Sequence, residues 1–246
     1  MNKYFLLFCI SFIFLLSCKK QDDTIDTGVD YYPIDTGRYY IYNVQLITYS
    51  IDTSTVINKS TIGDSCGDYV IVDTMNYQLK EYYHGTISSS DELLYRIERY
   101  TRSSDTAQWP AQPDSGVWTV AINNNMIIRT ENNQPFVKLE FPVQASKQWN
   151  GNLYNTFGVD NYVMYPVNAP YTVPGDTTYP TTLTVTQSNE QSLVDKNYQI
   201  EVYAKGIGLV YKYDAILQYD QCEEEIGQYF INYGIIYNKT LSSYGP

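Results

Sequence analysis

Four cysteines and a single histidine are the residues of this chain best suited to covalent or metal chemistry. Cys18 directly follows an apolar segment, where a secretory signal would be cleaved. Cys66 and Cys222 would then face an oxidising compartment, in which a disulfide bond between them can persist. Two unpaired thiols are the alternative, because sequence alone cannot place two cysteines within bonding distance.

His84 is the histidine, and it follows a tyrosine-rich segment beside Gly85. A zinc site of the usual kind needs three or four His or Cys ligands, which this chain lacks unless both later cysteines are free and close. A Ser-His-Asp arrangement would need a nucleophile setting, and no Gly-x-Ser-x-Gly motif occurs. We therefore expect no catalytic residue, metal or cofactor, and interpret His84 as a surface or packing residue.

Carboxylates are abundant, with 27 Asp and Glu residues, so two of them will lie close together in any fold. Paired carboxylates can hydrolyse glycosides, but abundance is no evidence for such a pair. We expect Glu98 to form an ion pair across neighbouring strands. The run Glu223 to Glu225 is expected to form a solvated loop, because no calcium-loop motif accompanies it.

The segment from Phe5 to Leu16 is apolar and follows Lys3, which is the layout of a secretory signal. As a helix it would rise only ~20 Å, too short for the ~30 Å hydrocarbon core of a bilayer. Residues 15–18, Leu-Leu-Ser-Cys, resemble the bacterial lipobox. The resemblance implies a signal peptide over residues 1–17 and a lipidated Cys18 as the mature N-terminus; an ordinary signal with a plain thiol is the alternative. Two or more acyl chains anchor a protein stably.

Residues 18–30 are polar and acidic without periodicity, which predicts a flexible tether between the lipid and the domain. The acidic stretch after the cysteine resembles the signal that sends Bacteroidota lipoproteins to the outer face of the outer membrane. Loss of Lys3 with the signal would make the formal net charge −12. A surface this acidic excludes nucleic acid as a partner.

Residues 31–246 are expected to form a single β-rich domain, because Tyr, Val, Ile and Thr alternate in short segments separated by turn residues. We predict an all-β fold, one twisted antiparallel sheet curved into a half-barrel or sandwich, with little helix. Two long surface loops are expected, at 101–116 and 169–180. The predicted strands are 38–50, 55–62, 69–72, 77–83, 93–101, 117–122, 126–131, 136–141, 162–165, 181–187, 198–204, 208–219 and 229–237.

Six segments lie in order along the chain: YYPIDTGRYYIYNV (31–44), YQLKEYYHG (77–85), YRIERYTR (95–102), FVKLEFPV (136–143), QWNGN (148–152) and EVYAKGIGLVYKY (201–213), which contains a YAKGIGLVY-type motif. Together they resemble an uncharacterised family of Bacteroidota lipoproteins. The family has no established activity, so the resemblance implies only a lipid-anchored β domain.

Aromatic residues and glycines carry the remaining signals. The 27 tyrosines suit either ligand contact or half-buried sheet surface. Trp149 lies in an expected turn and is our candidate contact for a glycan or an envelope protein. Thr24 and Thr106 follow aspartates in triplets that resemble the O-glycosylation motif of Bacteroidota. The Gly-x-Gly at 206–208 lacks the strand-to-helix context of a nucleotide site, which favours a turn or a close strand contact.

These observations favour a non-catalytic lipoprotein of the outer membrane, anchored by lipid and displayed at the cell surface, with a binding or structural role. One alternative is a carrier of a lipid or hydrophobic ligand, which predicts an apolar cavity open to solvent. A second alternative, a secreted glycan hydrolase, predicts two convergent carboxylates of perturbed pKa.

Overall fold

The computed structural model describes residues 26–51, 70–89, 92–114, 116, 118–123, 125–175, 177–223 and 225–246. Cys18, Thr24, Cys66 and the strand predicted over 55–62 lie outside these residues. No helix in the described part of the chain is long and apolar enough to cross a membrane.

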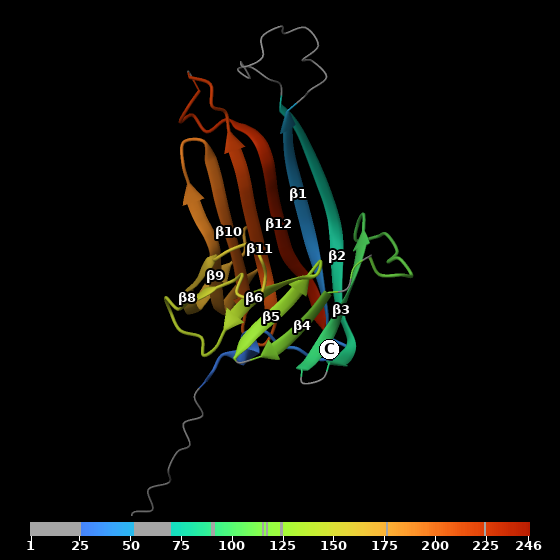
Figure 1. Cartoon of the computed structure of the whole chain (residues 1–246). Helices are drawn as coiled ribbons and strands as arrows, with labels where there is room; N and C mark the ends of the chain where they lie inside the picture. Colours follow the sequence, from blue (N-terminus) through green and yellow to red (C-terminus); the bar gives the residue numbers. More distant parts are fainter. Residues whose placement is uncertain are drawn as a thin grey trace, which may run out of the picture.

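Twelve strands form one antiparallel sheet with the order β6-β5-β4-β3-β2-β1-β12-β11-β10-β9-β8-β7 (Figure 1). A single turn of 3-10 helix, η1 (Val29–Tyr31), precedes it. The strands are β1 (Tyr39–Ile51), β2 (Val70–Ser89), β3 (Glu92–Arg102), β4 (Trp118–Asn123), β5 (Met126–Glu131), β6 (Gln134–Glu140), β7 (Gln148–Asn150), β8 (Asn161–Thr172), β9 (Thr178–Gln191), β10 (Asp195–Ala204), β11 (Gly208–Tyr219) and β12 (Ile231–Gly245).

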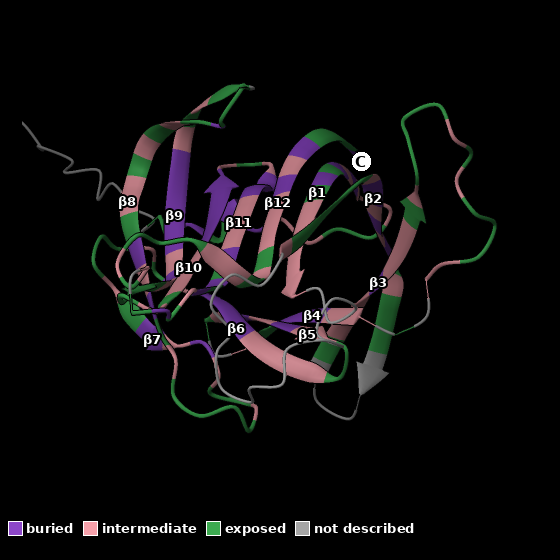
Figure 2. Cartoon of the chain, turned by 90° about the horizontal axis from the view of Figure 1, so that it is seen from above, coloured by how far each residue is buried: buried purple, intermediate pink, exposed green. Residues whose placement is uncertain are grey.

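The sheet curls until its two edge strands meet, so that it nearly closes into a barrel (Figure 2). The Val137 amide of β6 donates to the Gly151 carbonyl just after β7, at 2.9 Å. The Trp149 Nε1 donates to the Val137 carbonyl at 2.8 Å. We call this contact the seam. The predicted all-β half-barrel is confirmed, and the single continuous sheet excludes the sandwich.

The core lies inside the lower part of the curled sheet, where strands β4 to β6 face β8 to β11. Aliphatic residues from opposite sides of the curl are fully buried there, among them Ile127, Leu139 and Leu183. Tyrosines contribute as well, because Tyr31, Tyr42 and Tyr203 are at most 1% exposed. Packing in the core therefore accounts for part of the high tyrosine content.

Most predicted strands are present, with β5 and β11 at the predicted limits. Two predicted strands, 69–72 and 77–83, are parts of the one long strand β2. The predicted loop at 169–180 is wrong, because β8 continues to Thr172 and β9 begins at Thr178. The Pro- and Gly-rich composition of 169–180 suggested a loop, but Pro170 lies where the pairing of β8 with β9 shifts register, so its missing amide hydrogen interrupts no regular ladder.

The turns follow the predicted chemistry. Asn132 and Asn133 link β5 to β6 with φ of 50° and 64°, as a two-residue hairpin turn of the primed type requires. Gly206 has φ of 76° in the turn between β10 and β11. A Cβ atom at Gly208 would lie 3.0 Å from the Tyr40 hydroxyl. The Gly-x-Gly thus serves a turn and a close approach, as the sequence indicated.

Residues 26–30, which the sequence analysis placed in the tether, are held against the domain. The Gly206 amide donates to the Asp30 carbonyl at 2.8 Å, and the Val143 amide donates to the Thr27 carbonyl at 3.0 Å. Asp26 also accepts a hydrogen bond from the Lys205 ammonium. Backbone and ion-pair contacts therefore join residues 26–30 to the domain.

The seam generates a test of stability. A Cβ atom at Gly151 would lie 2.3 Å from Cζ of the buried Tyr162, so Gly151→Ala should lower the free energy of unfolding by about 1–3 kcal/mol. Gly85→Ala is the matched control, because a Cβ there meets no atom within 4 Å. Urea unfolding of both variants measures the effect; equal stability of the two would contradict the packing described for the seam.

Candidate functional site

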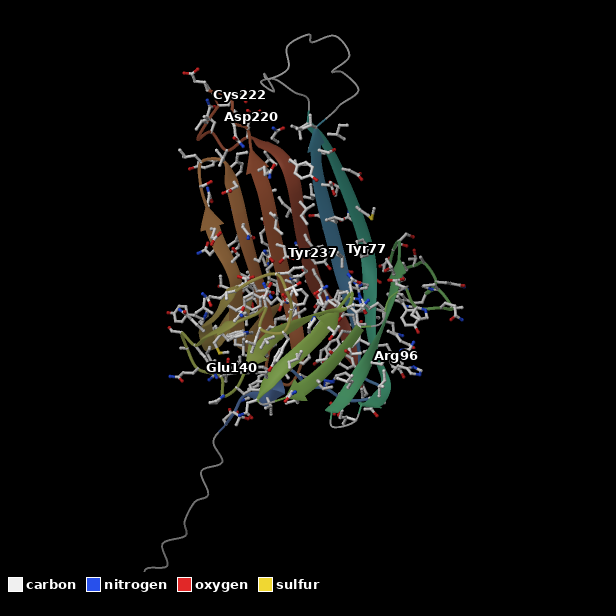
Figure 3. All side chains as sticks on the ribbon, in the orientation of Figure 1. Tyr77, Arg96, Glu140, Asp220, Cys222 and Tyr237 are labelled. Atoms are coloured by element: carbon white, nitrogen blue, oxygen red, sulfur yellow. The ribbon has the colours of Figure 1, made fainter. Side chains whose placement is uncertain are left out.

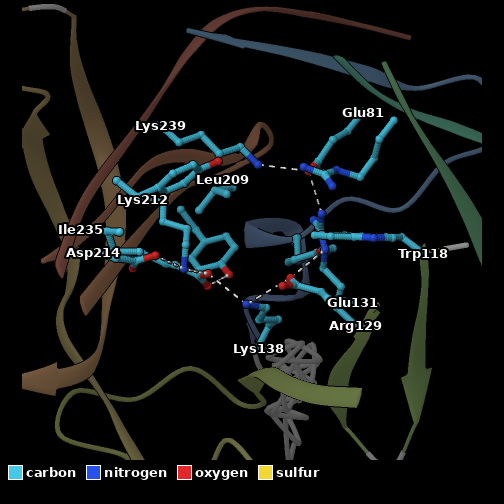
Figure 4. Close-up of a pocket in the computed structure, with 15 residues that line it drawn as sticks. Glu81, Trp118, Arg129, Glu131, Lys138, Leu209, Lys212, Asp214, Ile235 and Lys239 are labelled. Atoms are coloured by element: carbon cyan, nitrogen blue, oxygen red, sulfur yellow. Dashed lines mark hydrogen bonds and ion pairs between the residues drawn. The ribbon is translucent and has the colours of Figure 1, made fainter. Parts of the chain in front are cut away.

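Charged side chains surround a cavity of about 320 Å³ inside the curled sheet, which we call the chamber (Figure 4). Five cations and four carboxylates line it, together with tyrosine, tryptophan and aliphatic side chains. Its lining residues are Tyr32, Glu81, Arg99, Trp118, Arg129, Glu131, Lys138, Glu201, Tyr203, Leu209, Lys212, Asp214, Ile235, Tyr237 and Lys239.

Strand register places these side chains opposite one another. Glu201 of β10 pairs with Lys212 of β11, and Lys212 pairs with Lys239 of β12, so the three form one row across the sheet. Glu81 of β2 pairs with Arg99 of β3 in the same way. Because side chains directly opposite each other share a face, each row points into the chamber.

Glu81 is the centre of the first cluster, and it is 1% exposed. Its Oε1 accepts from Arg129 Nη2 at 2.7 Å and from Lys239 Nζ at 3.1 Å. Arg99 Nε lies 3.8 Å from the same oxygen. Burial alone would raise the pKa of this carboxyl, but Arg129 and Lys239 hold the pKa well below its usual range. One carboxylate is therefore shared by three cations.

Glu201 is the centre of the second cluster, and it is 2% exposed. Its Oε1 accepts from Lys138 Nζ at 3.0 Å and Lys212 Nζ at 3.2 Å, while its Oε2 accepts from the Tyr203 hydroxyl at 2.6 Å. Burial opposes ionisation of this carboxyl, but the two lysines hold its pKa well below the usual range. Lys212 also contacts Asp214 at 3.1 Å.

Glu131 links the two clusters. Its Oε1 lies 3.1 Å from Arg129 Nε and 3.3 Å from Lys138 Nζ. Burial acts against ionisation of this carboxyl too, yet the two cations lower its pKa. Around Glu201 the charges balance, whereas the Arg99, Arg129 and Lys239 side chains outnumber the carboxylates that contact them, which are Glu81 and the shared Glu131. The chamber therefore carries its excess positive charge at the Glu81 end.

Aromatic rings cover the cations of the Glu81 cluster. The Trp118 ring centroid lies 4.0 Å from Cζ of Arg99 and 5.0 Å from Cζ of Arg129. The ammonium of Lys239 lies 3.8 Å from the Tyr42 ring. Burial, opposed by Glu81 but reinforced by Arg129, lowers the pKa of Lys239 to about 8.

Above the chamber the inward face of the sheet is open to solvent and carries a row of apolar side chains, with Thr48 and Asp73 as polar residues on the same face. Side chains on alternate residues share a face, so Tyr233 lies on the same face as Ile235, Tyr237 and Lys239. The face continues onto the neighbouring strands through directly paired residues. Ile216 of β11 is opposite Ile235, and Leu46 of β1 is paired with Tyr237 on one side and Met75 of β2 on the other. We call this surface the trough. Its most exposed members are Met75 (54%), Tyr233 (55%), Ile71 (49%), Ile216 (44%) and Ile235 (36%).

Trp149 is not the exposed contact that the sequence suggested. It is 6% exposed, because its indole lies in the seam and packs edge-on against Tyr162, with ring centroids 6.0 Å apart. Asn150 and Gly151, which follow Trp149, led to the prediction of a turn. In the structure β7 (Gln148–Asn150) includes Trp149 and ends just before Gly151.

The other predicted residues lie away from the chamber. His84 is largely exposed, with Nδ1 3.4 Å from Glu98 of the neighbouring strand, which confirms a surface role and the cross-strand pairing of Glu98. Thr106 is exposed in the loop after β3. Its hydroxyl lies 3.1 Å from that of Ser104. Glycosylation at Thr106 stays a prediction.

Cys222 is disulfide-bonded, and every other cysteine lies outside the described residues. The pairing with Cys66 therefore stays a prediction. Asp220, Cys222 and Glu225 form the one group of three potential metal ligands in the described part of the chain, at the upper end of the sheet (Figure 3). A disulfide sulfur is no thiolate ligand, so we do not interpret this group as a metal site.

No family model matches the sequence, and no curated protein matches it. Among solved structures, the chain is similar to a Bacteroides fragilis protein described as exported, with a YmcC-like fold. The TM-score is 0.38 with 10% sequence identity, over 87% of this chain and 98% of the other. Likeness at this level assigns the chain to no family.

The chamber generates a test of pH dependence. The pKa of Lys239 is lowered from 10.5 to about 8 in the folded protein. Between these values the unfolded chain binds a proton that the folded chain does not, so Lys239 makes the free energy of unfolding rise with pH in this window. The stability of the wild type minus that of Lys239→Met should therefore increase from pH 8 to pH 10.5.

Urea unfolding of both proteins across the window gives this difference, and the buried tyrosines, common to both, largely cancel. A difference that stays flat or falls with pH would contradict the buried, cation-flanked position of Lys239.

Proposed function

We propose that this protein is a lipid-anchored, non-catalytic lipoprotein of the outer membrane that binds one amphipathic ligand inside its half-barrel. The polar end of the ligand would enter the chamber, and its single apolar chain would lie along the trough. This combines the binding role expected first from the sequence with the carrier alternative. The carrier predicted an apolar cavity; the cavity found is charged, and the apolar surface lies beside it.

The continuity of the chamber with the trough is the observation that carries the proposal. Ile235 and Tyr237 line the chamber, and both also belong to the trough. From Lys239 to Tyr233 the strand β12 advances by six residue steps, which is ~20 Å at the rise of an extended strand. A long, single acyl chain fits this length. Covering exposed apolar side chains supplies binding free energy of ~25 cal/mol per Å².

The shape of the molecule is compatible with the anchor. In Figure 1 the first described residues lie at the lower end of the sheet, and the trough runs along the long strands toward the upper end. A lipid at Cys18 would therefore leave the upper end of the trough facing away from the attachment point. The acidic segment after Cys18 is what supports display at the outer face of the outer membrane.

A hydrolase is the second candidate, and one observation favours it. Asp214 and Glu201 both contact Lys212, and burial raises the pKa of Asp214 while the pKa of Glu201 is lowered. Opposite shifts in neighbouring carboxyls are typical of acid and base pairs. However, both oxygens of Glu201 already accept hydrogen bonds from Lys138, Lys212 and Tyr203. This engagement favours a binding role over catalysis.

The anchor is tested by the chemistry of residue 18. We expect the N-terminal peptide of the mature protein to begin at Cys18 and to carry a thioether-linked diacylglycerol and an acylated amine. Mass spectrometry of the purified protein detects both groups, and Cys18→Ala should abolish acyl labelling of the protein, because the sulfur that carries the diacylglycerol is gone. An unmodified mature N-terminus, or one elsewhere in the chain, would contradict the anchor.

The trough is tested with a neutral apolar dye, N-phenylnaphthylamine, whose fluorescence rises on binding. Met75→Asp should weaken dye binding about tenfold, because it places a charge on the apolar surface. Val72→Asp is the matched control, since Val72 lies on the same strand with 55% exposure against 54% for Met75, three residues away on the outer face. Equal loss in both variants, or no dye binding by the wild type, would contradict the proposal.

A further inference from the structure

We propose that the ligand is a single-chain amphiphile with an anionic headgroup, a carboxylate or phosphate monoester, bound by Arg99, Arg129 and Lys239. This inference rests on the proposed function and names the chemistry of its ligand. It commits to the Glu81 end of the chamber as the headgroup site.

Charge is the first argument. Arg99, Arg129 and Lys239 surround one carboxylate, Glu81, within 3.8 Å. Glu131, which contacts Arg129, is shared with Lys138. Buried charges without compensation are costly, so this cluster is the part of the chamber that gains most from a further anion. The protein as a whole is acidic, with a formal net charge of −11, which makes the local excess of cations specific to this site.

An unused donor is the second argument. The Nε atom of Arg99 is buried, forms no hydrogen bond among the described residues and lies 3.8 Å from Glu81 Oε1. The Nε atom of Arg129, by contrast, already contacts Glu131 Oε1 at 3.1 Å. The Arg129 side chain is 6% exposed. The Arg99 side chain is 24% exposed, so it lies at the rim of the chamber, beside Trp118. Guanidinium groups bind carboxylate and phosphate oxygens in a fixed geometry, and a rim arginine is placed to meet an incoming headgroup.

The transition from chamber to trough is the third argument. Lys239, Tyr237 and Ile235 follow one another on the inward face of β12, so charge, hydroxyl and hydrocarbon occur in that order. Tyr237 also hydrogen-bonds to Tyr77, and both side chains lie midway along the long strands (Figure 3). An amphiphile has the same order, from its charged headgroup to the end of its chain.

The opposite end of the chamber argues against a cationic headgroup. The carboxylate of Glu201 is neutralised by Lys138 and Lys212. Asp214 has one unbonded buried oxygen, but burial raises its pKa and Lys212 already contacts it. An ammonium group would therefore find no carboxylate without a cation, whereas an oxyanion finds the Arg99 Nε donor without a hydrogen bond.

Isothermal titration of the purified domain with amphiphiles of equal chain length tests the inference. The probes are laurate, dodecyl phosphate, neutral dodecyl maltoside and cationic dodecyltrimethylammonium, each below its critical micelle concentration. We expect laurate, dodecyl phosphate or both to bind at least tenfold more tightly than the neutral and cationic probes. Comparison of the two anions then identifies which headgroup the site prefers.

Two variants locate the headgroup. Lys239→Met and Arg99→Met should each weaken binding of the anionic probe about tenfold and leave binding of dodecyl maltoside unchanged. Lys196→Met is the control, because it removes the same charge from outside the chamber. Arg99 is the more exposed of the two cations and contacts Glu81 only at 3.8 Å. Arg99→Met therefore keeps the contacts of Glu81 with Arg129 and Lys239, and it tests the headgroup site even if Lys239→Met fails to fold.

The outcomes separate the inference from the proposed function. Equal affinity for the neutral and anionic probes, or unchanged anion affinity in both variants, overturns the headgroup site and leaves the carrier function standing. Tightest binding of the cationic probe also overturns it. Failure of every probe to bind overturns the carrier function as well.

Discussion

Closure of the sheet at the seam is the constraint on which the rest of the structure depends. One backbone hydrogen bond, from Val137 to Gly151, and one indole hydrogen bond, from Trp149 to Val137, join strands at opposite ends of a twelve-stranded order. These contacts hold β4, β5 and β6 over the lower half of the long strands. Without them the inward-facing charges would be exposed to water, where an ion pair contributes little.

Burial of so many charges has a cost that hydrophobic residues of similar volume would not have. A buried ion pair is weak evidence for stability, because desolvation offsets much of the attraction. The chamber nevertheless holds nine charged side chains, with Glu81 and Glu201 each bound by at least two cations. Stability of the fold does not require this arrangement. The proposed binding role explains it, because fixed charges inside a cavity can recognise a charged headgroup.

Local pattern was sufficient for the fold but not for the site. Alternation of apolar and polar residues, with Asn and Gly at the turns, correctly predicted most strands and the all-β class. β7 was missed because three residues, Gln148 to Asn150, are too few to show a period. The chamber was missed because contacts between residues far apart in the sequence assemble it: Glu81 is bonded by Arg129, 48 residues away, and by Lys239, 158 residues away. The signal in the sequence that could have indicated the chamber was an acidic or basic residue inside a tyrosine-rich strand.

The seam has a further consequence, for the backbone of the edge strands. An uncovered strand edge is a template for pairing with another molecule. Here the amide and carbonyl of Val137 are both occupied, and the Asn155 side chain covers the Pro135 carbonyl at 2.9 Å. These three backbone groups of β6 are thus satisfied within one molecule. Copies crowded onto one surface would find them already paired.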